Sequence, residues 1–168
     1  MKSFRLWICR LIFAFFPESR GFAVKTTILR WCGAELGLNV RIYSSVRFLG
    51  TGRLYIGDDV HIGANGYISP VNGAVIRIGS HVDIGPSVMI LTGSHKITPD
   101  GEHIGGDGIS QSVCIGDGCW IGARAIILPG VKLPPKTVVA AGAVVTASPK
   151  NESMLIAGVP AKEKKCYA

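Results

Sequence analysis

A branched aliphatic or aromatic residue returns at every sixth position along most of the stretch between residues 36 and 145. A period of six fits neither the 3.6-residue period of a helix nor the two-residue alternation of an amphipathic strand. The spacing therefore predicts a solenoid of short strands with a sharp turn after each strand. Its interior would consist of five triplets, one per coil: Leu36, Ile42, Phe48; Ile56, Ile62, Ile68; Ile78, Ile84, Ile90; Ile115, Ile121, Ile127; Leu133, Val139, Val145.

Two further positions of the repeat have a restricted composition. A glycine often follows the sixth-position residue, as at Gly37, Gly57, Gly63, Gly79, Gly85, Gly116 and Gly122. The position four places after that residue is small or β-branched, as in Val40, Val60, Cys119, Ala125 and Ala143. We expect the glycines to supply backbone freedom at the turns, and the stacked coils to rise about 24 Å at about 4.8 Å per coil. A β-sandwich is the alternative, but its turns do not recur at one fixed spacing.

The repeat is interrupted at three places. Leu54 and Tyr55 would form a small insertion, and residues 74–77 a second one. The third interruption, residues 96–112, holds Pro99 and several glycines, which predict a long loop without regular structure. Residues looped out of a solenoid leave its core unchanged. Because long irregular loops in compact domains are typically functional, we expect this loop to shape a site.

The first 35 residues lack the repeat and are strongly apolar. Residues 4–16 end at Pro17 and are too short to span a hydrocarbon core of about 30 Å. They predict a helix that either covers the open end of the solenoid or makes peripheral contact with an anionic membrane through Trp7 and the phenylalanines. A second apolar stretch, residues 23–32, ends at Gly33, as expected after a helix C-cap.

Composition narrows the choice of partner and compartment. The net charge of +7 comes from Lys and Arg gathered toward the two ends of the 168-residue chain, which predicts anionic partners such as phosphates or an acidic membrane surface. No basic face interleaved with aromatics appears, so nucleic acid is not expected. The five cysteines show no paired metal spacing. We expect reduced thiols and a cytoplasmic location, with peripheral contact at the inner face of the membrane as the finer alternative.

His95 is the strongest candidate for chemistry. It stands at the last position of its repeat, outside the expected core and directly before the loop at 96–112. A histidine titrates near neutral pH and can take a proton from a reacting group. The alternative is an exposed turn histidine with no role.

The triplets, the loop after His95 and four closing segments together resemble the hexapeptide-repeat acyltransferases. Within that family the chain is most similar to the sugar O-acetyltransferase branch, which includes galactoside and maltose acetyltransferases and those of exopolysaccharide gene clusters. The resemblance covers about residues 36–165, and the closing segments are residues 119–123, 127–131, 141–145 and 157–162. It implies an all-β fold, a left-handed parallel β-helix, with a short α-helical N-terminal segment. It also implies a homotrimer with active sites between subunits, acetyl-CoA in the groove, and no metal.

The expected organisation has three parts. Residues 1–35 form the apolar helical segment, residues 36–150 form the β-helix with its extended loop at 96–112, and residues 151–168 contribute to coenzyme A binding.

The resemblance also assigns roles residue by residue. His95 matches the catalytic base, and Asn65 matches an asparagine beside the acceptor sugar. The backbone N–H of Ala123 matches the donor that stabilises the oxyanion, and Trp120 is expected to line the acceptor channel. Coenzyme A would be bound by Ala123, Ala141, Thr146, Lys162 and Lys165. The family often has Lys-Asp where this chain has Ala147-Ser148, so one nucleotide contact is expected to be missing.

These features predict an acetyltransferase that moves an acetyl group from acetyl-CoA to a sugar hydroxyl in polysaccharide or glycolipid biosynthesis. The alternative is N-acetylation of a nucleotide-linked amino sugar; such enzymes often add an N-terminal α/β domain, for which residues 1–35 are too short and too apolar. A zinc carbonic anhydrase needs three converging histidines. Here His61 and His95 are expected at turns on different sides of the column, His81 mid-repeat and His103 in the loop, so the histidines do not line up on one corner. A purely structural solenoid would leave His95 unexplained.

Overall fold

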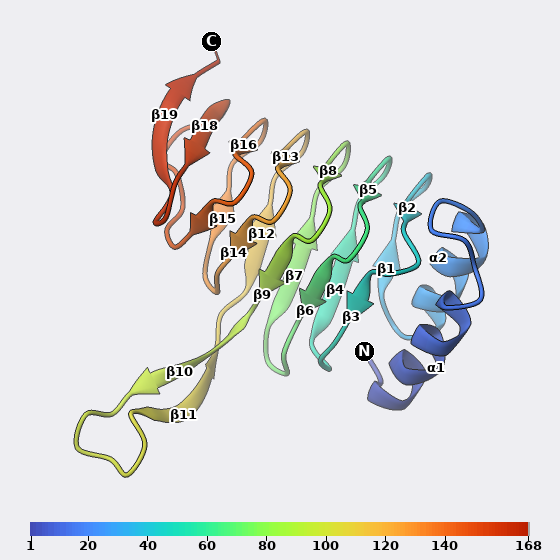
Figure 1. Ribbon diagram of the computed structural model, residues 1–168, viewed down its shortest axis with the longest axis horizontal. Coiled ribbons are helices and arrows are strands. Elements are labelled where there is room, and N and C mark those ends of the chain that lie inside the picture. Colours follow the sequence, from blue (N-terminus) through green and yellow to red (C-terminus); the bar gives the residue numbers. More distant parts are fainter. Residues whose placement is uncertain (168) are drawn as a thin grey trace.

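The computed structural model describes residues 1–167, which form a parallel β-solenoid with two helices at one end and an antiparallel strand pair at the other (Figure 1). Three sheets make its three sides. Sheet A contains β1 (Glu35–Leu36), β4 (Arg53–Ile56), β7 (Val75–Ile78), β12 (Val113–Ile115) and β15 (Lys132–Leu133). Sheet B contains β2 (Arg41–Ile42), β5 (His61–Ile62), β8 (Asp83–Ile84), β13 (Trp120–Ile121), β16 (Val138–Val139), β18 (Met154–Ala157) and β19 (Lys162–Cys166). Sheet C contains β3 (Arg47–Phe48), β6 (Tyr67–Ser69), β9 (Met89–Leu91), β14 (Ile126–Ile127) and β17 (Val144–Val145).

The chain visits the sheets in the order A, B, C, so it turns three corners per coil, which we call the AB, BC and CA corners. Parallel pairing places each sixth-position residue over its equivalent one coil away. In sheet B, for example, Ile62 pairs with Ile84, which pairs with Ile121. All fifteen sixth-position residues lie in strands, and all are buried except Leu36, which is partly buried at the helical end. The predicted period, strands and core are confirmed.

The glycines after the sixth-position residues have a different role from the expected one. None of them has a positive φ; the left-handed residue of the AB and BC corners falls two places later, as at Asn65 (φ 58°) and Arg124 (φ 60°). The glycines are instead points of close approach between coils. A Cβ on Gly122 would lie 2.6 Å from the amide nitrogen of Ala141 in the next coil. Glycine is therefore required there by contact, while the turn itself accepts several residue types.

The first two interruptions are not loops, and that expectation was wrong. Leu54 lies in β4, and Ile76 lies in β7, where the two residues pair with each other. Ile76 also pairs with Val113 of β12. All three side chains are buried, with at most 1% of their surface exposed. The extra residues thus lengthen one side of the coil and add a further ladder to the core.

The third interruption is a hairpin, so the expectation of no regular structure was also wrong. β10 (Gly93–Ile97) pairs antiparallel with β11 (Gly105–Ser110), and the two strands project away from the solenoid (Figure 1). At the base, the amide of Gln111 donates a hydrogen bond to the carbonyl oxygen of Thr92, 2.8 Å away. The chain then re-enters the column at β12, and the stacking continues.

Helices α1 (Ser3–Phe13) and α2 (Phe22–Trp31) cover the first coil. Three side chains of α1 and Leu29 of α2 join the main core; those of α1 are Leu6, Cys9 and Phe13. The predicted helix end at Gly33 is confirmed: the amide of Gly33 (φ 98°) donates to the carbonyl of Arg30, and that of Ala34 to Leu29. No helix within residues 1–167 is both long enough and apolar enough to cross a membrane.

A buried lysine fastens the helices to the column. The ammonium group of Lys25 donates hydrogen bonds to the carbonyl oxygen of Glu18 and to the hydroxyl of Ser44, each at 3.0 Å. Lys25 has no exposed surface, and this burial lowers its pKa, while the charge of Glu18 opposes the shift. The contact joins the helical segment to the corner between β2 and β3.

The close approach at Gly122 predicts a clear effect on stability. Gly122→Ala places a methyl group against the backbone of the next coil, and we expect the free energy of unfolding to fall by about 1–3 kcal/mol. Gly108→Ala in the hairpin is the matched control, because a Cβ there meets nothing within 4 Å. Urea unfolding measures both variants. Equal stabilities would show that the coils can separate at Gly122 without cost.

Candidate active site

His95 lies in β10, at the base of the hairpin, with an exposed side chain. Its Nδ1 is 2.9 Å from the carbonyl oxygen of Gly106 on the facing strand. Because a carbonyl oxygen only accepts hydrogen bonds, Nδ1 carries the proton in this contact. In the neutral ring, Nε2 is then left with a free lone pair. The hairpin therefore holds the imidazole in the tautomer that a general base needs.

A cavity of about 390 Å³ opens beside His95. The polar side chains around it are Asn72, Ser94 and Ser110, which come from the CA corner and from both strands of the hairpin. These three residues have no distinctive pattern in the sequence, since each is an isolated polar residue. The cavity is large enough for a small ligand and offers hydroxyl and amide groups for hydrogen bonding.

Thr92 stiffens the wall of this cavity. Its buried hydroxyl accepts a hydrogen bond from the amide of Val71 at 2.8 Å and donates one to the carbonyl oxygen of Ser69 at 3.1 Å. Val71 lines the cavity, and Thr92 immediately precedes the hairpin. One side chain thus couples the position of the hairpin to the preceding coil.

Three of the other predicted site residues lie at the BC corner. Asn65 is exposed there and donates its backbone N–H to the hydroxyl of Ser45 at 2.8 Å. Ala123 and Ala141 occupy the same corner in later coils, where the amide of Gly142 donates to the carbonyl oxygen of Ala123. Within residues 1–167 the Ala123 N–H donates no hydrogen bond.

The remaining predicted site residues lie toward the far end of the column. Trp120 is in β13 on the outer face of sheet B, with 59% of its surface exposed. Lys162 and Lys165 are exposed on β19, which pairs antiparallel with β18. Thr146 is exposed just after β17. The amide of Ala161 donates to the carbonyl oxygen of Val144, and this contact brings the start of β19 beside sheet C.

One chain does not bring these groups together. Asn65 comes just before a strand of sheet C, whereas His95 follows the end of the next strand of that sheet. Because β6 and β9 run parallel, the two residues lie at opposite edges of sheet C. His95 is therefore at the CA corner, and Asn65, Ala123 and Ala141 are at the BC corner. One chain therefore places the two sets of predicted site residues at different corners.

The other histidines differ in part from their expected places. His61 lies within β5 rather than at the expected turn, whereas His81 is mid-repeat as expected, at an AB corner (φ 58°). Each faces a carboxylate, with Nδ1 of His61 3.9 Å from Asp83 and Nδ1 of His81 3.4 Å from Asp59. Burial, aided by a nearby arginine, lowers the pKa of His61. Across residues 1–167, no group of three or more His, Cys, Asp or Glu side chains could hold a metal ion.

A solenoid with these corner features defines the class of hexapeptide-repeat proteins, and comparison with known sequences agrees. The family described as the hexapeptide repeat of succinyl-transferase matches residues 53–88 and 112–147. A galactoside O-acetyltransferase of Lactococcus lactis is 37% identical over 94 residues, which cover 54% of this chain and 45% of the relative. The chain spans about half the length of several curated relatives that it matches.

A longer match extends over most of the chain. The putative colanic acid biosynthesis acetyltransferase WcaF of Escherichia coli is 30% identical over 139 residues, covering 82% of this chain and 72% of the relative. Among solved structures, a hexapeptide-repeat acetyltransferase of Vibrio cholerae complexed with acetyl coenzyme A has the same fold, with a TM-score of 0.73 and 24% identity over 99% of this chain and 87% of that one. The chain belongs to the hexapeptide-repeat acyltransferase family.

The two hydrogen bonds of Thr92 generate a prediction about the site's framework. Thr92→Val keeps the shape of the side chain but leaves the Val71 amide without its partner, and we expect a loss of about 1–3 kcal/mol in the free energy of unfolding. Thr51→Val, at an exposed position, is expected to change stability by less than about 0.5 kcal/mol. Thermal unfolding followed by circular dichroism compares the two. A Thr92 variant as stable as the Thr51 variant would contradict the role given to the hydroxyl.

Proposed function

We propose that this protein transfers an acetyl group from acetyl-CoA to a hydroxyl group of a sugar, in the synthesis of a polysaccharide or glycolipid. The observation that carries the proposal is the held tautomer of His95, which lines a cavity together with Asn72, Ser94 and Ser110. Membership of the acyltransferase family supports it. The name of the Escherichia coli relative supports a polysaccharide acceptor.

In the proposed reaction, Nε2 of His95 takes the proton of the sugar hydroxyl as its oxygen attacks the thioester carbonyl. A carbon–oxygen bond forms, and negative charge develops on the carbonyl oxygen. The free N–H of Ala123 donates a hydrogen bond to that oxygen. The carbon–sulfur bond then breaks, and the departing sulfur takes the proton back from His95, which leaves an acetyl ester and coenzyme A.

The other predicted residues take binding roles in this proposal. Asn65 holds a hydroxyl of the acceptor, and Trp120 lines the acceptor channel. Coenzyme A contacts Ala123, Ala141 and Thr146 along the column, while Lys162 and Lys165 meet its phosphates. Both lysines are exposed on the last strand and neither forms an ion pair within residues 1–167, which suits contact with phosphate. No metal takes part in the proposed reaction.

A homotrimer is part of the proposal, with each active site between two subunits. The separation of His95 from Asn65 and Ala123 supports it, since only a neighbouring copy can complete the site. We further propose that the protein works in the cytoplasm, at the inner face of the membrane, with peripheral contact through residues 4–16. The apolar side chains that α1 leaves exposed support this contact.

The reaction predicts a specific loss of activity in one variant. Release of coenzyme A from acetyl-CoA, measured across simple sugars, oligosaccharides and nucleotide amino sugars, should depend on a hydroxyl acceptor. His95→Ala should lower this rate about a hundredfold or more. His103→Ala, the other hairpin histidine, should stay near the wild-type rate. Normal activity of the His95 variant would refute its role, and turnover with amino sugars alone would favour N-acetylation.

If each active site lies between two subunits, two variants that each lack one site residue should recover activity when they assemble together. His95→Ala and Asn65→Ala chains mixed in equal amounts and reassembled should form some sites with both native residues. If the two chains mix at random in a ring, about a quarter of the sites combine a native His95 from one subunit with a native Asn65 from its neighbour. The mixture should then recover about a quarter of the wild-type activity. Unmixed variants, carried through the same denaturation and refolding, are the control. No recovery in the mixture would show that His95 and Asn65 do not act in one site across two subunits.

A further inference from the structure

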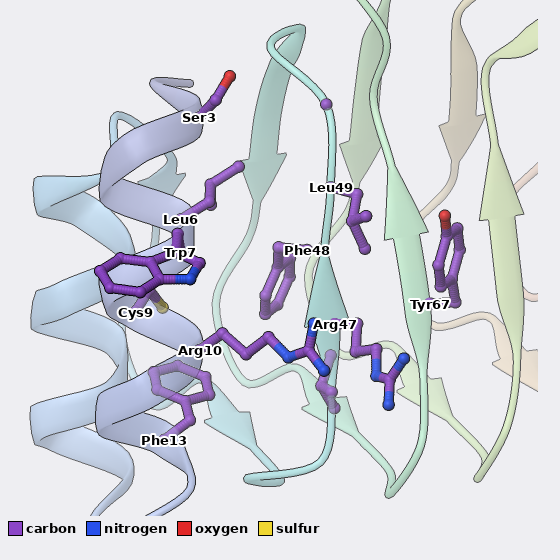
Figure 2. Close-up of a pocket in the computed structure, with 12 residues that line it drawn as sticks. Ser3, Leu6, Trp7, Cys9, Arg10, Phe13, Arg47, Phe48, Leu49 and Tyr67 are labelled. Atoms are coloured by element: carbon purple, nitrogen blue, oxygen red, sulfur yellow. The ribbon is translucent and has the colours of Figure 1, made fainter.

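A second cavity, of about 450 Å³, lies between α1 and the first strands of sheet C and shares no lining residue with the cavity at His95. Figure 2 shows its walls. One wall is the inner side of α1, and the other is β3 with the neighbouring residue Tyr67 of β6. Most of the lining is apolar or aromatic: Leu6, Trp7, Phe13, Val46, Phe48 and Leu49. We call it the α1 groove.

Two arginines supply the charge of the α1 groove. Arg10 extends from α1 across the gap toward β3, which carries Arg47 (Figure 2). No Asp or Glu lines the cavity. Within residues 1–167 neither guanidinium forms an ion pair or a side-chain hydrogen bond. Two arginines that line one cavity without a carboxylate favour the binding of an anion. Phosphate is a suitable anion, because a guanidinium group can donate two parallel hydrogen bonds to its oxygens.

An exposed apolar stripe runs along α1 beside the groove. Phe4, Trp7 and Leu11 follow at intervals of three and four residues, which places them on one side of α1, and Phe15 comes two residues after the helix ends at Phe13. Their exposed fractions are 71, 59, 46 and 88%. Phe4 and Trp7 stack, with ring centroids 6.2 Å apart. Trp7 also lines the groove, so the stripe and the cavity form one continuous surface.

We propose that the α1 groove binds an anionic phospholipid of a membrane surface. Arg10 and Arg47 hold the phosphate between them, and part of an acyl chain lies against Phe48 and Leu49. The apolar stripe enters the interface around that lipid, as aromatic side chains of surface helices do. This inference rests on the membrane contact proposed above for residues 4–16 and names the ligand of that contact; it does not use the residues of the proposed acetyl transfer.

The charge pattern distinguishes this ligand from the other occupants. A free phosphate would satisfy the arginines but leave the apolar wall of the groove in water. A second copy packed through the same surface would bring a second pair of arginines against the first. Only an amphiphile with a negative head group matches both the charged and the apolar parts of the groove.

Vesicle binding by the full chain, without acetyl-CoA, tests the proposal. The probes are vesicles of phosphatidylcholine alone and of phosphatidylcholine with phosphatidylglycerol at about 7:3. We expect binding to the mixed vesicles only. Arg10→Gln combined with Arg47→Gln should weaken that binding at least about tenfold. The matched control combines Lys132→Gln and Lys136→Gln, two exposed lysines near the other end of the solenoid that remove the same charge; it should retain binding within about twofold.

Insertion is tested with phosphatidylglycerol that carries bromine on its acyl chains, because bromine quenches nearby tryptophans. Quenching is expected in the wild type and should be strongly reduced in Trp7→Phe. Absence of vesicle binding, equal weakening in both charge variants, or quenching unchanged by Trp7→Phe would each overturn the proposal. A changed molecular mass of the arginine variant in light scattering would also overturn it, in favour of a second copy in the groove. None of these results would bear on acetyl transfer.

Discussion

The register between successive coils is the constraint on which the rest of the molecule depends. Most strands of the solenoid contain only two or three residues, and such strands are not stable alone. Each is held by parallel pairing with its equivalents one coil before and after, so that like side chains stack through the column. The ladder tolerates no extra atom where coils meet, as Gly122 and Ala141 show. Close stacking therefore restricts composition in the interior and at one corner position.

Because the interior is filled by these ladders, all chemistry must lie on the outside. The corners are the natural places, since a left-handed residue such as Asn65 or Arg124 turns the chain and leaves its side chain exposed. The three-sided coil separates its corners by the width of a sheet. This geometry places His95 and Ala123 at different corners of one chain. It also explains why assembly and activity are linked in the proposed mechanism.

The sequence predicted the period, the strands, the core and the end of α2 at Gly33, because each rests on local repetition or local backbone chemistry. It failed at Leu54 and Tyr55, since a period of six cannot distinguish a looped insertion from a longer strand. It failed at the hairpin as well, where glycines that disfavour regular structure are accommodated by pairing between two strands. The cavity residues Asn72, Ser94 and Ser110 were missed because only tertiary structure brings them together. Lys25 was missed since its burial depends on how the helices dock.

The hairpin at β10–β11 leaves the column and returns to it through one closed junction, where Gln111 bonds to Thr92. Strands β9 and β12 pair with the neighbouring coils on either side of the hairpin. The stacking of the coils therefore does not depend on the length of the hairpin between these strands. The segment can therefore change in size and sequence during evolution without a corresponding change in the core. The hairpin can therefore diverge between relatives while the stacked coils, and the stability that they provide, stay the same.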